Sequence, residues 1–177
     1  MNEQNLRKKS SMLPAFVDDV EQPLFHATRP LSHEDILDLA EAILHQRIQH
    51  RDVLNSAKAV KQFLAIRLGE REQEIFAVIF LNTKNIFIAY EELFCGTVNC
   101  CTVYSREVAR RGLEHNAAAI ILVHNHPSKI CKPSIDDLRI TQEIEQVVGV
   151  FDIRVLDHII VGGNVCYSFV EQGLWKR

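Results

Sequence analysis

The pattern of hydrophobic and polar positions divides the 177-residue chain into three parts. Residues 1–30 are polar, contain prolines and show no sustained periodicity, which predicts a flexible N-terminal arm. Residues 31–70 carry two one-sided apolar stripes at helical spacing, so we expect a helical extension made of two amphipathic helices. Ser32 is the expected N-cap of the first, with Asp35 at the capping-box position, and Gly69 is the expected end of the second.

From residue 71 onward the apolar runs are shorter, and strand-like and helix-like patterns alternate. The patterns predict strands over 75–81, 86–90, 97–103, 118–123, 153–156, 158–161 and 165–169, and helices over 105–115 and 134–148. Ser105 is the expected N-cap of the first of these helices. Because strands and helices interleave, we expect residues 71–177 to form one α/β (α+β) domain of three layers, with a mixed β-sheet flanked by helices.

Composition and charge limit the classes of protein to which this chain can belong. Hydrophobic residues make up 47% and charged residues 24% of the chain, which is enough apolar material for a core without a disulfide or metal staple. A formal net charge of -3 gives no electrostatic support for nucleic-acid binding. The five cysteines form no CxxC pair, and no apolar run suits a signal peptide or a membrane helix. We therefore expect free thiols, a cytoplasmic location and no membrane partner.

Two histidines and an aspartate stand out after the predicted strand 118–123. His124 and His126 are two residues apart, so their side chains leave a strand on the same face. Ser134 begins the next predicted helix and places Asp137 in its first turn. Two imidazoles and one carboxylate form a common zinc set that leaves a position open for water. A simpler explanation exists for each part, because Ser134 and Asp137 also suit a capping box and a strand-end histidine is often only a hydrogen-bonded residue.

The wider sequence around these residues resembles a known family. The spacing His124-x-His126-x7-Ser134-x2-Asp137 is similar to the JAMM motif of the JAB/MPN metalloproteases. Four segments closely resemble the bacterial RadC family: GTVN (96–99), SREV (105–108), NAAAIILVHNHPS (116–128) and LDHIIVGG (156–163). The resemblance implies a JAB/MPN-like (cytidine-deaminase-like) fold with one zinc ion on His124, His126 and Asp137. It also implies a metallopeptidase or isopeptidase that hydrolyses an unknown protein or peptide substrate with a zinc-activated water.

Further roles follow from the same resemblance. The family has an upstream glutamate that accepts a proton from the water, and it maps to Glu91 in this chain. Glu92 is the alternative, and strand alternation turns the two side chains to opposite faces, so only one can face the metal. Counting back from the Gly-Thr pair that follows favours Glu91. Ser134 is expected to hydrogen-bond the water or the developing oxyanion. His158 is a candidate outer partner of the ligands, although a lone histidine is more often structural.

The chain departs from the family pattern at Lys129, at Tyr104-Ser105 where family members commonly have His-Pro, and in its N-terminal part. Lys129 stands where the family usually has a glycine after HNHPS. If that position needs a positive φ, lysine carries a strain of about 1 kcal/mol, and we expect an altered loop with the metal ligands retained. The glycine hairpin of a helix-hairpin-helix module does not appear in residues 1–70.

Two other functions remain open at this point. The first alternative is a non-hydrolytic zinc-binding accessory protein in DNA repair or mobile-element biology. A nucleotide deaminase of similar architecture is disfavoured, because its H-x-E…P-C-x-x-C signature is missing.

Overall fold

The computed structural model describes residues 30–49, 57–96 and 102–175. The chain divides into two compact units, Met1–Leu39 and Ala40–Arg177. The predicted N-terminal arm lies outside the described residues except for Pro30, and so does most of the predicted strand 97–103. None of the described helices is both long enough and apolar enough to span a membrane.

Helix α2 (His33–Gln49) begins as the sequence predicts. Asp35 Oδ2 accepts hydrogen bonds from Ser32 N and Ser32 Oγ, both at 2.8 Å. Asp35 N in turn donates to Ser32 Oγ at 3.1 Å. These reciprocal bonds satisfy backbone donors that the first turn of a helix leaves without partners. The predicted capping box at Ser32 and Asp35 is confirmed.

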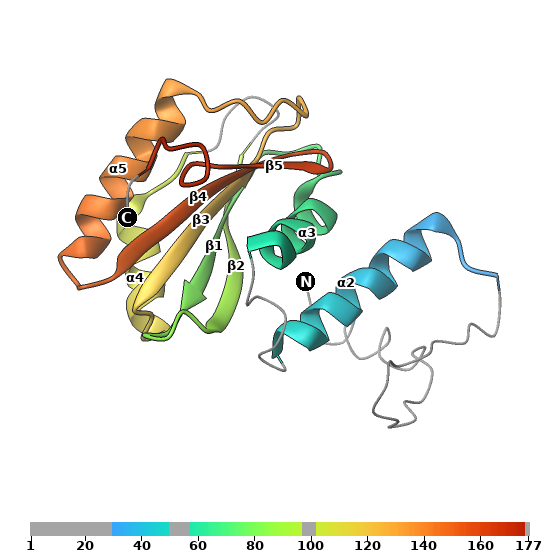
Figure 1. The fold of residues 1–177 in the computed structure, drawn as a ribbon, viewed down its shortest axis with the longest axis horizontal. Helices are drawn as coiled ribbons and strands as arrows, with labels where there is room; N and C mark the ends of the chain where they lie inside the picture. Colours follow the sequence, from blue (N-terminus) through green and yellow to red (C-terminus); the bar gives the residue numbers. More distant parts are fainter. Residues whose placement is uncertain (1–29, 50–56, 97–101, 176–177) are drawn as a thin grey trace. The chain divides into compact units, whose positions relative to one another are not determined.

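A five-stranded mixed sheet forms the centre of the second unit, with strand order β2-β1-β3-β4-β5 (Figure 1). The strands are β1 (Ile75–Leu81), β2 (Phe87–Cys95), β3 (Ala119–Asn125), β4 (Arg154–Gly162) and β5 (Val165–Ser168). Strand β1 is antiparallel to β2 and β3, β3 is parallel to β4, and β4 is antiparallel to β5. The parallel pair matters for function, because the carboxyl ends of β3 and β4 lie at the same edge of the sheet.

Helices cover both faces of this sheet. Helix α3 (Ala57–Leu68) packs on one face, and α4 (Ser105–Glu114) and α5 (Ile135–Gly149) pack on the other. Every residue of β1 is buried, which explains its continuous apolar run. Successive side chains of β1 alternate between the two cores: Ile75, Ala77 and Ile79 face α3, whereas Phe76, Val78 and Phe80 face α4 and α5. The predicted three-layer α/β fold with a mixed sheet is confirmed.

Several element boundaries differ from the sequence predictions. The two strands predicted over 153–156 and 158–161 form one continuous strand, β4, and β2 extends to Cys95. Helix α4 has Tyr104 at its N-cap position without a side-chain cap, so the predicted cap at Ser105 is wrong. Ser105 Oγ instead donates to Glu143 Oε1 of α5 at 2.7 Å. This bond joins the two helices on the same face of the sheet.

The polar residue Asp157 explains the unexpected continuity of β4. Its carboxylate accepts hydrogen bonds from His158 N at 2.8 Å, from Ser168 Oγ at 2.5 Å and from Val170 N at 3.1 Å. A charge inside a strand is tolerated when its acceptor capacity is filled in this way. Asp157 therefore links β4 to the end of β5 and does not interrupt the strand.

Candidate metal centre

The candidate ligands lie where the carboxyl end of β3 meets the N-terminus of α5. His124 is buried near the end of β3, on the face of the sheet that α5 covers. His126 follows the strand, and its backbone N–H donates to Val161 O of β4 at 2.8 Å. Asp137 lies in the first turn of α5 and begins the buried stripe of that helix, which continues through Thr141 and Ile144. Three separate elements therefore direct these side chains to one point.

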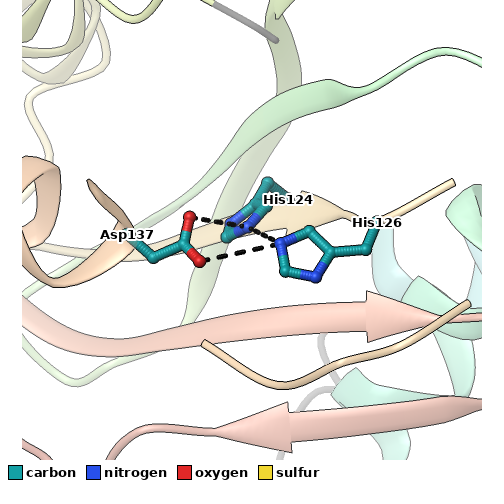
Figure 2. A group of neighbouring side chains, drawn as sticks. All are labelled: His124, His126 and Asp137. Carbon is teal, nitrogen blue, oxygen red and sulfur yellow. Dashed lines mark hydrogen bonds and ion pairs between the residues drawn. The ribbon is translucent and has the colours of Figure 1, made fainter. Parts of the chain in front are cut away.

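The three predicted ligand side chains converge, as Figure 2 shows. His124 Nε2 lies 2.9 Å from His126 Nε2 and 3.1 Å from Asp137 Oδ1, and His126 Nε2 lies 3.6 Å from Asp137 Oδ2. Ligand atoms on a tetrahedral zinc ion, at about 2.1 Å from the metal, lie roughly 3.4 Å apart. The observed spacing is close to this value. Among the described residues, this is the group of His, Cys, Asp and Glu side chains whose ligand atoms lie within 4.8 Å of one another.

The ring of His126 is held in the tautomer that binds a metal through Nε2. Its Nδ1 lies 2.7 Å from Ile130 O. A carbonyl oxygen can only accept a hydrogen bond, so Nδ1 carries a proton and Nε2 is the ring nitrogen left for a metal. The loop between β3 and α5 therefore orients His126 through its own backbone.

Asp137 has two roles at once. Its Oδ2 accepts a hydrogen bond from Ser134 N at 2.7 Å, while Asp137 N donates to Ser134 Oγ at 3.1 Å. These bonds form a complete capping box at the start of α5. The same carboxylate faces both histidines. The simpler capping explanation is thus true of Asp137, and it is compatible with metal binding because a carboxylate has about four lone-pair sites.

Electrostatics keep Asp137 ionised. Burial alone raises the pKa of this carboxyl, but hydrogen bonds from His124 and His126 outweigh burial and hold the pKa well below its ordinary value. The Asp137 carboxylate in turn raises the pKa of His126. Burial lowers the pKa of His158 far below its ordinary value, so this imidazole is neutral. The site therefore offers one anionic carboxylate, Asp137, to a cation, next to the imidazoles of His124 and His126.

The two glutamates considered from the sequence lie on opposite faces of β2. Glu91 accepts from Arg111 Nε of α4 at 2.6 Å and contacts His115 Nε2 at 2.9 Å. Glu92 faces α3, where Arg67 Nε donates to its Oε1 at 3.1 Å. Glu91 therefore shares the face of His124, as strand alternation predicts. Its hydrogen bond with Arg111, reinforced by His115, lowers the pKa of the Glu91 carboxyl.

The strand register places Glu91 away from the ligands. Glu91 pairs with Val78, whereas His124 pairs with Phe76 on the other side of β1. At about 3.3 Å per residue and 4.8 Å per strand, the Glu91 and His124 backbones differ by roughly 7 Å along the strands and roughly 10 Å across the sheet. The assignment of Glu91 as the proton acceptor stays a prediction.

Glu74 is a second acidic candidate, which the sequence analysis did not single out. Glu74 lies two residues before Phe76, which pairs with His124, so it stands immediately before β1, beside the end of β3 that carries the histidines. The charge of Glu74 is the smallest of the contributions that raise the pKa of His126. Gly96 N donates to Glu74 O at 2.8 Å and fixes the backbone there.

Asn125, between the two histidines, holds the segment that carries Glu74. Its Oδ1 accepts from Ile75 N at 2.8 Å, and its Nδ2 donates to Gln73 O at 3.0 Å and to Arg71 O at 3.3 Å. Asn125 is buried, so these bonds satisfy both ends of its amide. The sequence shows an amide residue between the two histidines. It does not show which segment of the chain that amide binds.

The loop after the histidines has the strain expected at Lys129. Lys129 has a φ of 61°, in the left-handed region that favours glycine. Its carbonyl oxygen would lie 2.7 Å from a Cβ at Gly162, so the loop packs directly on the β4 backbone. Its ammonium lies 3.2 Å from Glu70 Oε2. The metal ligands nonetheless converge, in agreement with the expectation that they are unaffected.

Lys129→Gly is expected to raise the free energy of unfolding by up to about 1 kcal/mol, because glycine adopts a positive φ without the Cβ clash. Chemical denaturation of the metal-free protein measures this change. Lys129→Ala is the matched control: it removes the exposed ion pair with Glu70 but keeps the strain, so we expect little effect. A loss of stability in Lys129→Gly would show that the loop is not strained at this position.

Comparison with known proteins adds independent information about this arrangement. A family model described as a RadC-like JAB domain matches residues 54–174. A UPF0758 protein of Cellvibrio japonicus is 44% identical over 138 residues, and one of Janthinobacterium sp. is 47% identical over the same length. Each alignment covers 78% of this chain and 62% of the relative. The chain thus spans less than two thirds of the length of these relatives.

Proposed function

The chain belongs to the RadC family and contains its RadC-like JAB domain, and on this basis we propose that it is a zinc-dependent hydrolase of peptide or isopeptide bonds. The observation that carries the proposal is the convergence of His124 Nε2, His126 Nε2 and an Asp137 carboxylate within 4.8 Å. Three protein ligands of this kind leave one coordination position for water or substrate, which is typical of catalytic zinc sites.

The donor set supports zinc in particular. Imidazole nitrogen and carboxylate oxygen are both good zinc ligands, whereas Ca²⁺ and Mg²⁺ prefer sites made of oxygen alone. Asp137 contributes the one negative charge, and Ile130 O fixes the proton of His126 away from the ligand atom. A bound zinc ion lowers the pKa of water toward neutrality and polarises a carbonyl group.

The remaining chemistry belongs to side chains around the ligands. We propose Glu74 as the group that accepts a proton from the attacking water and delivers it to the leaving amine, because it stands immediately before β1, beside the end of β3 that carries the histidines, and its charge acts on His126. Glu91 remains the competing candidate from the sequence. Ser134 Oγ accepts from Asp137 N, which leaves its own proton available to donate to a developing oxyanion. The exposure of Ser134 at the start of α5 is compatible with this role.

The proposal extends to the cellular setting. The described cysteines Cys95, Cys131 and Cys166 are unpaired, which supports a reducing, cytoplasmic location. The substrate is proposed to be a protein or peptide, and the activity of the longer relatives is not carried over to this chain.

The test combines metal analysis with hydrolysis of a peptide library. We expect the purified protein to hold about one zinc ion per chain and to cleave some library peptides, as measured by mass spectrometry. Treatment with a chelator should abolish cleavage, and added zinc should restore it. Metal-free protein that does not take up zinc would contradict the proposal. Zinc binding without cleavage of peptides or isopeptide-linked conjugates would instead favour the non-hydrolytic accessory role.

A further inference from the structure

A buried chain of polar groups connects two of the candidate ligands behind the site. His124 Nδ1 lies 2.8 Å from His158 Nε2, and His158 Nδ1 lies 2.6 Å from Thr141 Oγ1. Thr141 Oγ1 donates to Asp137 O, one turn earlier in α5, at 2.5 Å. His158 and Thr141 are both fully buried. The chain therefore runs from β3 through β4 to α5, and it joins His124 to the helical turn that carries Asp137.

The chemistry of the groups sets the direction of every bond in this chain. The Asp137 carbonyl can only accept, so the Thr141 hydroxyl donates to it. Thr141 Oγ1 then accepts from His158 Nδ1–H, so the fully buried His158 ring presents the lone pair of its Nε2 to His124. That lone pair accepts from His124 Nδ1–H. A proton of His124 is thereby held on Nδ1, and Nε2, which faces His126 and Asp137, is the ring nitrogen left for a metal.

We propose that His158 and Thr141 are positioning residues that fix His124 in its metal-binding tautomer. The inference rests on the proposed metal site but concerns the protein before any metal arrives. Outer partners of metal-bound histidines are commonly carboxylates or backbone carbonyls, which can only accept. Here a neutral imidazole takes that place, and an imidazole can either donate or accept. Thr141 determines whether His158 donates or accepts toward His124. Its hydroxyl donates its one proton to Asp137 O and can therefore only accept from His158.

If Thr141 fixes the tautomer of His124, its substitution should have an effect that a loss of packing alone would not have. Thr141→Val keeps the shape of the side chain but removes the acceptor for His158 Nδ1–H. His158 Nδ1–H would then be a buried donor without an acceptor, which is costly. We therefore expect the proton of His158 to move to Nε2. Nε2–H points at His124 Nδ1, so His124 must carry its proton on Nε2, the proposed ligand atom. Thr141→Ser keeps the hydroxyl and loses only a buried methyl group.

The experiment measures zinc affinity by competition with a chromophoric chelator, and thermal unfolding of the metal-free forms. We expect Thr141→Val to bind zinc roughly 10- to 100-fold more weakly than the unaltered protein. Thr141→Ser should bind within about threefold of it, although the lost methyl group lowers its unfolding temperature. Both variants should therefore lose stability, but only Thr141→Val should lose zinc affinity, which a purely structural role for the cluster does not produce.

Nitrogen-15 NMR of the metal-free protein tests the tautomer directly. We expect the unaltered protein and Thr141→Ser to show a protonated Nδ1 on His124, and Thr141→Val to show a protonated Nε2. Equal zinc affinity in Thr141→Val and Thr141→Ser, or an unprotonated His124 Nδ1 in the unaltered protein, would overturn the inference. If the unaltered protein bound no zinc, the metal proposal would fail, whereas the NMR result would still decide the tautomer.

Discussion

Replacing Asp137 with asparagine is expected to remove most of the zinc from the purified protein. The amide is neutral and a weaker metal ligand than the carboxylate it replaces. Loss of an outer partner costs roughly 10- to 100-fold in metal affinity, and loss of a direct ligand should cost more than that. The amide oxygen can still accept from Ser134 N, so the cap of α5 should survive. Zinc per chain, measured by mass spectrometry after dialysis against a weak chelator, provides the readout.

The adjacent residue supplies a matched control. Asp136 is exposed, and its Oδ1 accepts from Arg139 Nη1 at 3.3 Å, away from the two histidines. Asp136→Asn makes the same change of charge one residue earlier and should retain about one zinc ion per chain. Equal retention of zinc by Asp136→Asn and Asp137→Asn would remove Asp137 from the ligand set. Circular dichroism confirms that both variants keep their helices.

The second large effect concerns the proton acceptor. We expect Glu74→Gln to lower the rate of hydrolysis by about 10²- to 10⁴-fold while zinc content stays at about one ion per chain. The change keeps the size of the side chain and removes only its basicity. Hydrolysis is followed on the library peptides that the unaltered protein cleaves. Because an inactive variant still binds substrate, immobilised Glu74→Gln can also capture substrates from a cell extract.

Glu91→Gln distinguishes the two acidic candidates. Its carboxylate is paired with Arg111 and His115, so we expect loss of stability with hydrolysis largely retained. The folded-state pKa of Glu91 is lowered, so its ionised form stabilises the fold above the ordinary glutamate pKa. That contribution disappears as the pH falls through the lowered pKa. The difference in unfolding free energy between Glu91→Gln and the unaltered protein should therefore shrink in acid. Abolished hydrolysis in Glu91→Gln, with Glu74→Gln active, would support the sequence-based assignment.

Much of the fold could be predicted from local patterns. The apolar run that became β1 and the capping pairs at Ser32 and Ser134 are signals within a few residues of sequence, and the structure contains them where expected. The gap predicted at Asp157, between strands 153–156 and 158–161, was wrong. Its hydrogen-bond partners, Ser168 and Val170, lie on the next strand and beyond it. A polar residue can be recognised as part of a strand only once its distant partners are known.

The candidate site shows the same division between local and distant information. His124, His126 and Asp137 could be proposed from ligand type and spacing. Glu74 could not, because its place beside the histidines depends on the register between β1 and β3. His158 was a candidate without a stated partner. Its bonds to His124 and Thr141 depend on how α5 packs against β4.

The capping box at Ser134 and Asp137 has a consequence for the order of events in a cell. Both its bonds form within the polypeptide, so the start of α5 is complete without an ion. On the proposal that this site binds zinc, folding of the chain and supply of the metal are separate steps. We expect folded, metal-free protein to persist in a cell that is short of zinc. Once zinc is supplied, that stored protein should gain activity within the time of an ion-binding reaction, without new translation.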